Sequence, residues 1–401
     1  MARIVHFTDA TVGGVNGIAS SIGLLVQTLT RRGHECVVAS AGPLFGAGDG
    51  SDGVMWVPSM PTGMGDFRFV FFPLRSIRGR VRAWRPDIAH VHTPGPLGAA
   101  GLTMARQLGI PAVYTYHTDL HGYSEQYHLP TPVIRAGIAV YARHLGRVTT
   151  TWPVGKYEVI EAGNARVCAA AEVIIAPTAS ALRRCRMDAF AGKVRVIATP
   201  PSLGPAGSTA AEFRARFGIA ADCAVVLFVG RLSGEKGIRL LLDAFAAVRG
   251  QVPAKLVLVG PQSRRLGLRR LLDRAGLTPH TVITGTLCGP EVQAAYRAGT
   301  VFAFPSSTDT QGIVLHEAAL AGLPIVMTDR RLHDSHPLAE AMQVTDPTPT
   351  ALAAGIATLL LEPDQARLLG QRARLIAQKH TPERFADETL QAYSHACRSV
   401  L

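Results

Sequence analysis

The chain has 401 residues, of which 47% are hydrophobic and only 17% are charged. This length exceeds one ordinary domain, and the composition supports sizeable cores, which excludes a disordered tail or a small disulfide-stapled module. The formal net charge of +12 attracts anions, and it divides into 20 − 12 = +8 for residues 1–200 and 21 − 17 = +4 for the remainder. Basic residues are dispersed and no DNA- or RNA-binding motif is visible, so we expect no nucleic-acid partner.

The spacing of the cysteines and the length of the apolar runs indicate the cellular compartment of the protein. The six cysteines form no close pairs with metal-ligand spacing, so we expect reduced thiols. The first apolar run, Ile4–Phe7, is too short for a signal peptide, and no run approaches the ~20 apolar residues that a membrane-spanning helix needs. We therefore expect a cytoplasmic protein whose contact with the inner face of the cell membrane is at most peripheral.

Short β-rich runs alternate with longer helical patterns through the first half of the chain, which is typical of a parallel sheet covered by helices. Residues 18–32 are apolar at helical spacing and are followed by Gly33, a normal helix stop. The predicted strands of this half are Ile4–Phe7, Glu35–Ala39, Ile88–Val91, Ala112–Tyr116 and Val173–Ala176.

The second half repeats this plan after a Pro/Gly/Ser-rich linker at Thr199–Ser208. Its first predicted elements are the strand Ala224–Val229, the loop Gly230–Gly237, the helix Ile238–Val248 and the strand Lys255–Val259. The sequence therefore predicts an α/β protein with two Rossmann-like domains, 1–200 and 201–378, and a C-terminal helix within 379–401 that packs back on the first domain.

The first loop joins the first predicted strand to the first predicted helix. It places Gly13, Gly14 and Gly17 around Asn16. Glycine lets backbone amides approach a phosphate, and the start of a helix adds partial positive charge. An ordinary turn between strand and helix would use the same glycines. The spacing also differs from the GxGxxG of dinucleotide enzymes, so we predict no NAD.

Two further loops carry charged side chains. Arg231 and Lys236 follow a predicted buried strand, where two cations would neutralise a diphosphate leaving group unless the loop is a plain solvated turn. Asp309 and Glu317 lie eight positions apart across a turn and a helix start. One carboxylate could bind sugar hydroxyls and the other a ribose diol, or Asp309 could simply cap the helix, and the spacing alone does not decide between these roles.

Four segments in order, Thr8–Ala19, Pro86–His117, Val229–Gly237 and Phe304–Pro324, resemble the retaining glycosyltransferases of family 4, whose GT-B fold has two Rossmann-like domains facing across a cleft. The likeness extends over nearly the whole chain. The last segment is similar to the family's E-x7-E motif, with Asp309 where the first glutamate usually stands. Residues 198–204 lack the Pro-Asn-Gly that often follows the interdomain strand.

The resemblance implies a role for each of these side chains in the second domain. Arg231 and Lys236 would bind the donor diphosphate, and Glu317 the ribose hydroxyls. Asp309 would bind the transferred sugar together with the next residues of its loop, namely Thr310, Gln311 and Gly312.

In the first domain the resemblance implies that Gly17 meets the phosphates and that His117, in the run Tyr114–Asp119, stabilises charge at the reaction face of the sugar. It also implies retention by front-face attack, in which the leaving phosphate assists deprotonation of the acceptor. The catalytic residues would then be His117, Asp309 and Glu317, with no side-chain nucleophile, metal or cofactor.

A basic segment at residues 73–85 gives information on the kind of acceptor. If it is helical from Pro73, one face carries arginines and the opposite face is apolar, as in a helix that lies on an anionic membrane. The arginines are Arg75, Arg78, Arg82 and Arg85, and the apolar residues are Leu74, Ile77, Val81 and Trp84. The alternative is a helix that packs on the core and exposes a solvated basic face.

Two short runs, Thr310–Gly312 and Tyr116–Thr118 with Tyr123 and Tyr127 after it, look similar to bacterial glycolipid-forming members such as diacylglycerol glucosyltransferases. They favour transfer of a hexose from a UDP- or GDP-linked donor to a lipid hydroxyl. The alternatives are a soluble acceptor such as an aminocyclitol, a phosphorylase or epimerase-like reaction, and a nucleotide-sugar binding protein without turnover.

Overall fold

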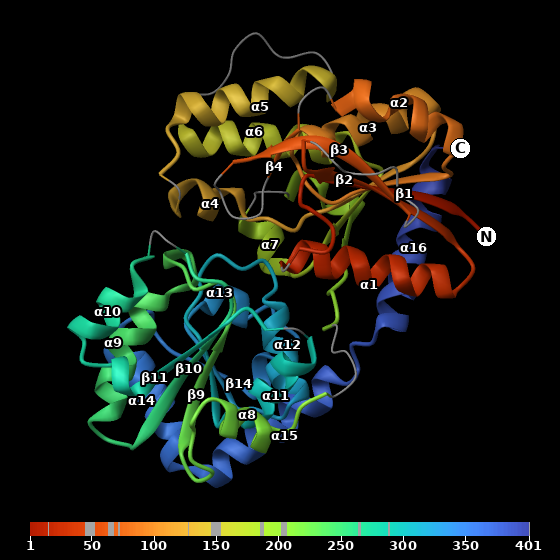
Figure 1. Ribbon diagram of the computed structural model, residues 1–401. Helices are drawn as coiled ribbons and strands as arrows, with labels where there is room; N and C mark the ends of the chain where they lie inside the picture. The colour runs from red at the N-terminus through yellow and green to blue at the C-terminus, as the bar shows by residue number, and fades with distance from the viewer. Residues whose placement is uncertain are drawn as a thin grey trace. The chain divides into compact units, whose positions relative to one another are not determined.

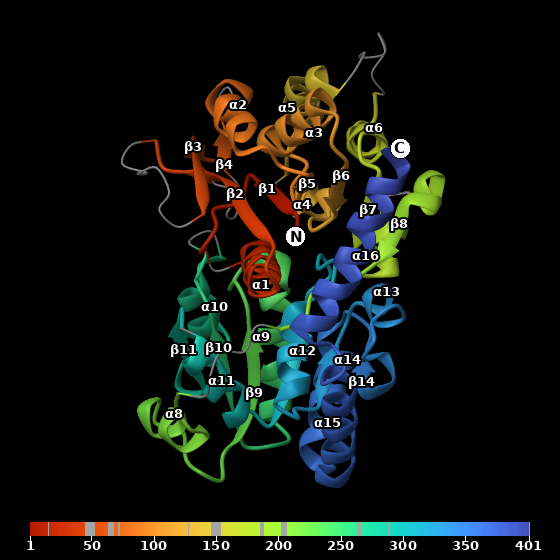
Figure 2. The same cartoon turned by 90° about the vertical axis from the view of Figure 1, so that its right-hand side faces the viewer.

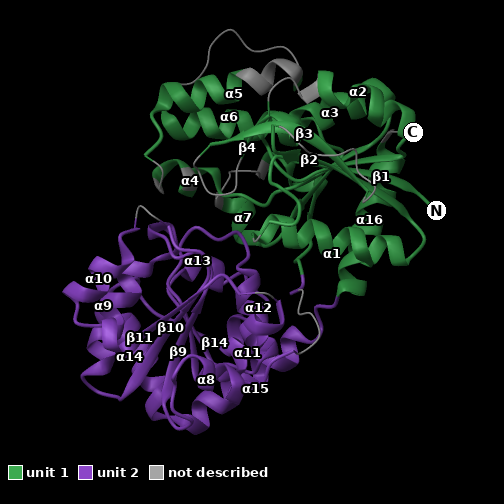
Figure 3. Cartoon of the chain, in the orientation of Figure 1, with its two compact units in different colours: residues 1–199, 382–401 green, residues 200–381 purple. Residues whose placement is uncertain are grey.

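The computed structural model describes residues 1–14, 16–44, 53–62, 68–70, 73–126, 128–145, 154–184, 188–201, 207–263, 266–287 and 289–400 (Figure 1). The chain forms two compact units, Met1–Thr199 with Pro382–Leu401 and Pro200–Thr381 (Figure 3). Among the described helices, none combines the length and the apolar character that crossing a bilayer requires. Cys36, Cys168, Cys223 and Cys397 are free thiols, and Cys185 and Cys288 lie outside the described residues.

Unit 1 contains an eight-stranded sheet in the order β4-β3-β2-β1-β5-β6-β7-β8. Its strands are β1 (Arg3–Thr8), β2 (Glu35–Gly42), β3 (Val54–Pro61), β4 (Arg68–Val70), β5 (Ile88–Val91), β6 (Ala112–Thr115), β7 (Val173–Ala176) and β8 (Val194–Val196). Neighbouring strands are parallel except β3 and β4, which are antiparallel. The helices are α1 (Gly17–Arg31), α2 (Pro73–Trp84), α3 (Pro96–Leu108), α4 (Leu120–Gln126), α5 (Thr131–Leu145), α6 (Lys156–Ala169), α7 (Ala179–Arg184), η1 (Asp188–Lys193) and α16 (Pro382–Val400).

Unit 2 contains a six-stranded parallel sheet in the order β11-β10-β9-β12-β13-β14. Its strands are β9 (Ala224–Val229), β10 (Ala254–Val259), β11 (Thr281–Gly285), β12 (Val301–Phe304), β13 (Ile325–Met327) and β14 (Met342–Val344). Around them lie α8 (Ala210–Arg216), η2 (Gly234–Lys236), α9 (Ile238–Arg249), α10 (Leu268–Arg274), η4 (Thr278–His280), α11 (Gly289–Ala298), α12 (Ile313–Leu320), α13 (Arg330–His333), η5 (Ala339–Ala341), α14 (Pro349–Leu361) and α15 (Pro363–Ala377).

The predicted alternation of strands and helices in both halves is confirmed. The strands predicted at Ile88–Val91, Val173–Ala176 and Ala224–Val229 have the same bounds as β5, β7 and β9. Strand β3 was not predicted, because Pro58 and Pro61 lie within it and proline usually breaks a strand pattern. In the predicted linker, residues 202–206 lie outside the described residues.

The C-terminal helix α16 completes unit 1. It lies against α1, β6 and β7, where Figure 2 shows it running along the strands. Phe385 and Tyr393 of α16 join a buried cluster with Ile4 and Val113, which come from strands near the start of the chain. Unit 1 is therefore built from two segments that are separated in sequence by the whole of unit 2.

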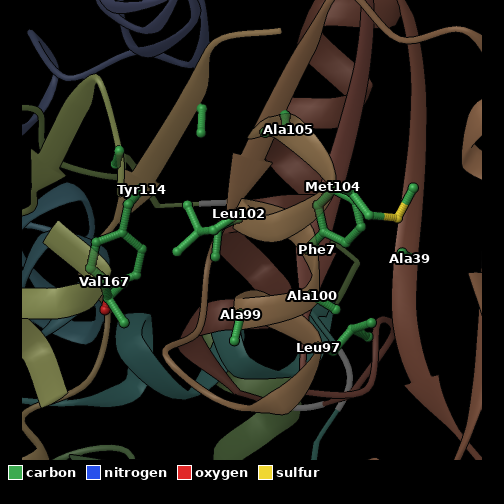
Figure 4. Close-up of a cluster of buried hydrophobic side chains, with 14 of the residues drawn as sticks. Phe7, Ala39, Leu97, Ala99, Ala100, Leu102, Met104, Ala105, Tyr114 and Val167 are labelled. Atoms are coloured by element: carbon green, nitrogen blue, oxygen red, sulfur yellow. The ribbon is translucent and has the colours of Figure 1, made fainter. Parts of the chain in front are cut away.

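Helix α3 packs very closely against the carboxyl ends of β1 and β5. A β-carbon at Gly98 would lie 1.8 Å from the Thr93 carbonyl oxygen. The buried Asp9 carboxylate accepts hydrogen bonds from the backbone amides of Leu97 (2.8 Å) and Gly98 (3.2 Å) and from the Thr93 hydroxyl (2.6 Å). Farther along the helix, a β-carbon at Gly101 would lie 2.6 Å from the ring of Phe7. Ala100 and Met104 belong to the same buried cluster as Phe7 (Figure 4). These contacts fix the start of α3 to the end of the first strand.

Replacing Gly98 with alanine should destabilise unit 1, because the new methyl group has no space next to the Thr93 carbonyl. We expect a loss of about 1–3 kcal/mol in the free energy of unfolding, as for other overpacked sites. The control is Gly137→Ala in α5, where a β-carbon meets nothing within 4 Å and alanine should add up to about 1 kcal/mol. Urea titration of both variants measures this; equal stabilities would contradict the packing argument.

Candidate functional site

In unit 2 the predicted donor-binding residues other than Glu317 lie in two segments, one after β9 and one after β12, which are neighbouring strands of the sheet. The two loops touch through their backbones. Gly237 has a φ of 70°, and a β-carbon there would lie 2.3 Å from the Pro305 carbonyl oxygen. The first loop can therefore take this position only with glycine at residue 237.

Charged side chains pair within and between these loops. Lys236 Nζ lies 2.7 Å from Asp309 Oδ1, which joins the first loop to the second. Arg231 Nη1 lies 3.1 Å from Glu235 Oε1 within the first loop. The Lys236 and Asp309 side chains keep 23% and 20% of their surface exposed, so both are accessible to a ligand. Glu235 was not predicted, although its position four residues after Arg231 is a spacing at which charges often pair.

The sequence left open whether Asp309 caps the following helix, and the structure decides this point. The residue that caps α12 is Gly312, with a φ of 71° and no side-chain hydrogen bond. Asp309 therefore does not cap the helix. Gln311 is buried and Gly312 directly precedes α12, so the loop from Thr310 to Gly312 ends at the positive end of a helix dipole.

Glu317 lies in α12 and is partly buried. Its Oε2 accepts a 2.7 Å hydrogen bond from the hydroxyl of Tyr296 in α11. Burial raises the pKa of Glu317, and the Tyr296 hydrogen bond partly opposes this. Burial and the nearby Glu317 carboxyl raise the pKa of Tyr296, so its hydroxyl remains a donor. Tyr296 was not predicted, since nothing in the sequence pairs it with a residue 21 positions later.

In unit 1, Gly17 is the first residue of α1 and is exposed. The helix is capped by Asn16, whose Oδ1 accepts from the Ala19 amide at 2.8 Å. The Val12 amide donates to Ser40 Oγ at 3.0 Å, which ties the loop to β2. The loop therefore presents the start of a helix to solvent, as an anion site requires.

His117 lies two residues after the end of β6 and is partly exposed. Its Nε2 lies 3.1 Å from His92 Nδ1, and His92 Nε2 lies 3.0 Å from His6 Nδ1. Burial lowers the pKa of His117 to about 4 and that of His6 to about 3, so these rings are neutral at pH 7. His6 and His92 were not singled out from the sequence. The available signal was a histidine within a buried strand, because buried polar groups need hydrogen-bond partners.

The basic helix α2 packs on the core of unit 1. Ile77 and Val81 are fully buried, and Trp84 packs against the same cluster under the guanidinium of Arg3, which lies 4.7 Å from the ring centre. The predicted basic face, Arg75, Arg78, Arg82 and Arg85, is exposed. The apolar side chains of Ile77, Val81 and Trp84 are therefore not available to lie in a membrane, whereas the arginine face is, and the side chain of Leu74 lies outside the described residues. Tyr127 and the side chain of Tyr123 lie outside the described residues.

Comparison with known proteins identifies the family of the chain. Residues 15–200 match the profile described as Glycosyltransferase Family 4, and residues 223–362 match Glycosyl transferases group 1. The chain is 26% identical over 335 residues to the alpha-monoglucosyldiacylglycerol synthase of Acholeplasma laidlawii, covering 81% of this chain and 80% of that protein. It is 30% identical over 336 residues to the D-inositol 3-phosphate glycosyltransferase of Kineococcus radiotolerans, covering 77% and 72%.

A solved structure shows the same fold. HepE of Anabaena, in complex with UDP and glucose, superimposes with a TM-score of 0.72 at 19% identity, covering 98% of this chain and 100% of that one. The two parallel-sheet α/β units and the matches to family profiles over both halves agree with one another. The chain therefore belongs to glycosyltransferase family 4 and is a hexosyltransferase with the GT-B fold.

Proposed function

We propose that this enzyme transfers a hexose from a UDP- or GDP-linked donor to a hydroxyl group of a membrane lipid, with retention of configuration and without a metal. The observation that carries the proposal is the Lys236–Asp309 ion pair, which lies beside the Arg231–Glu235 pair on two loops in backbone contact. Cations at this position suit a diphosphate, and a carboxylate suits the hydroxyls of a sugar.

The ion pairs also keep the charged side chains of the site ordered before the donor binds. Asp309 holds Lys236 in place, so its ammonium does not need to be ordered when the donor binds. A diphosphate carries more negative charge than one carboxylate and competes for Lys236. Asp309 is then released to accept hydrogen bonds from the sugar, while Glu317, positioned by Tyr296, binds the ribose diol.

The residues of unit 1 complete the proposal. The amides at the start of α1, from Gly17 onward, would meet the phosphates, and the neutral ring of His117 would face the sugar. Arg231 and Lys236 would neutralise the charge of the leaving group, so this step needs no metal ion. The leaving phosphate would assist deprotonation of the acceptor, so no side-chain nucleophile is assigned.

A lipid acceptor is supported by the relative that is named as a glucosyldiacylglycerol synthase and by the exposed arginine face of α2. Basic residues near an anionic membrane contribute about 1 kcal/mol each, so four arginines suffice for reversible docking at the membrane surface. The relative named as an inositol phosphate glycosyltransferase favours a second candidate, a soluble phosphate-bearing acceptor. In that case the same arginines are ordinary protein surface.

The substrate test uses UDP-glucose and GDP-mannose with diacylglycerol vesicles or with inositol phosphate as the acceptor. We expect glycolipid formation from one donor, unaffected by a chelator, and an axial anomeric linkage by NMR if configuration is retained. Product from inositol phosphate alone would replace the lipid proposal with the soluble one. Nucleotide binding without any transfer would indicate a binding protein.

Lys236→Ala and Glu317→Ala should each lower kcat/KM by roughly 100-fold or more, because each removes a charged contact to the donor. Lys255→Ala and Glu340→Ala are controls, since Lys255 donates to the Pro279 carbonyl and Glu340 pairs with Arg372, both at exposed positions. Steady-state assays and thermal unfolding of the four variants separate activity from stability. Near-normal activity of both site variants would overturn the assignment.

Replacing Arg75, Arg78 and Arg82 together with serine should weaken sedimentation with anionic vesicles, and the difference should shrink as salt is raised. The control carries the same loss of charge on another exposed helix, with Arg269, Arg270 and Arg274 of α10 changed to serine. Equal binding by the two triple variants would show that net charge, and not the α2 face, brings the protein to the membrane.

A further inference from the structure

Three imidazole rings form a continuous hydrogen-bonded chain across three neighbouring strands of unit 1. His6 lies in β1, His92 directly follows β5, and His117 lies two residues after the end of β6. The ring nitrogens are separated by 3.0 Å between His6 Nδ1 and His92 Nε2, and by 3.1 Å between His92 Nδ1 and His117 Nε2. His6 and His92 are buried and His117 is partly exposed, so the chain runs from the interior to the surface of the unit.

Neutral rings allow only two proton arrangements along this chain. Burial lowers the pKa of all three histidines, so none carries a second ring proton at pH 7. A neutral imidazole has one N–H and one bare nitrogen. His92 must then accept from one neighbour and donate to the other, and both hydrogen bonds run in the same direction. That direction is either outward, from His6 to His117, or inward.

The inner end of the chain distinguishes the two directions. Nε2 of His6 is buried and has no hydrogen-bond partner among the residues that the structure describes. The inward arrangement would place a proton on this atom without an acceptor, whereas the outward arrangement leaves it as a bare nitrogen. In proteins, buried donors without an acceptor are rarer than acceptors without a donor. The outward arrangement is therefore the favoured one.

We propose that His6 and His92 are positioning residues that hold His117 as its Nδ1–H tautomer, so that His117 presents an N–H donor at its outer nitrogen. The proposal rests on the function proposed above, in which His117 faces the sugar. A fixed N–H can stabilise an oxygen of the sugar or of the leaving group without reorganising during the reaction. A bare nitrogen in the same place would repel the lone pairs of that oxygen.

A metal site is the other chemistry that clustered histidines suggest, and His6, His90 and His92 do offer nitrogens close together in space. The nitrogens of His90, however, lie 2.7 Å from the hydroxyls of Thr115 and Tyr393. Both nitrogens of His92 are used in the chain. A metal ion would have to break these hydrogen bonds, so we assign the cluster to hydrogen bonding.

The test is the tautomeric state of the histidines in the full-length protein labelled with ¹⁵N-histidine. Long-range ¹H–¹⁵N correlation spectra should show three rings in the Nδ1–H form, although free histidine favours Nε2–H. His117→Gln, His92→Leu and His6→Gln assign the signals. Any of the three in the Nε2–H form would overturn the proposal, and so would stoichiometric zinc that is lost in His6→Gln.

The same protein tests the positioning role. In His92→Leu, the His117 ring should shift toward Nε2–H, and kcat should fall about 10- to 100-fold with little change in the KM for the donor. His280→Gln, in unit 2, is the control and should change neither the His117 tautomer nor kcat. An unchanged His117 tautomer in His92→Leu would overturn the inference. If His92→Leu does not fold, the tautomers of the three histidines in the wild-type spectrum still test the proposal.

The outcome also separates this inference from the function on which it rests. Full activity in His117→Gln, together with the Nδ1–H form in the wild type, would overturn the proposed role of His117 in transfer and still support the outward chain.

Discussion

Close approach of one backbone to another at the carboxyl ends of parallel strands is the constraint on which both candidate sites depend. In unit 1 the start of α3 lies against the Thr93 carbonyl at Gly98, and in unit 2 the loop after β9 lies against the Pro305 carbonyl at Gly237. Neither position has space for a β-carbon. Because the loops are fixed by backbone contact, their charged and polar side chains need little ordering when a ligand binds.

The two units balance charge in different ways around these fixed loops. Unit 2 places cations next to carboxylates, Lys236 with Asp309 and Arg231 with Glu235, so the loops tolerate partial burial before a donor arrives. Unit 1 uses neutral imidazoles that hydrogen-bond one another, with His6 and His92 buried and His117 partly exposed. The described contacts therefore pair the cations of unit 2 with carboxylates and the imidazoles of unit 1 with one another, and Nε2 of His6 is left as a bare nitrogen at the inner end of the histidine chain.

Local patterns in the sequence predicted the architecture well, because strands such as β5 and β9 are buried on both faces and read as short apolar runs. The same patterns predicted the loops that carry Arg231, Lys236 and Asp309. They did not predict that Lys236 pairs with Asp309, 73 positions later, or that His6 bonds His92, 86 positions later. Such contacts depend on the order of strands in the sheet, which no local pattern contains.

The role of the apolar face of α2 was also left open by the sequence. A helix that packs on the core and a helix that packs on a membrane need the same spacing of apolar residues.

The placement of α16 affects how the protein is made. Ile4 and Val113 emerge from the ribosome long before Phe385 and Tyr393, which cover them in the finished unit, and the whole of unit 2 is synthesised in between. Unit 2 is contiguous and can fold on emergence, whereas unit 1 waits with an uncovered apolar surface and with His90 lacking its Tyr393 partner. Chaperones and proteases therefore meet a half-finished first unit until α16 has been synthesised. Ribosomes that stall within the codons for Pro382–Val400 would release chains with a complete unit 2 and an incomplete unit 1.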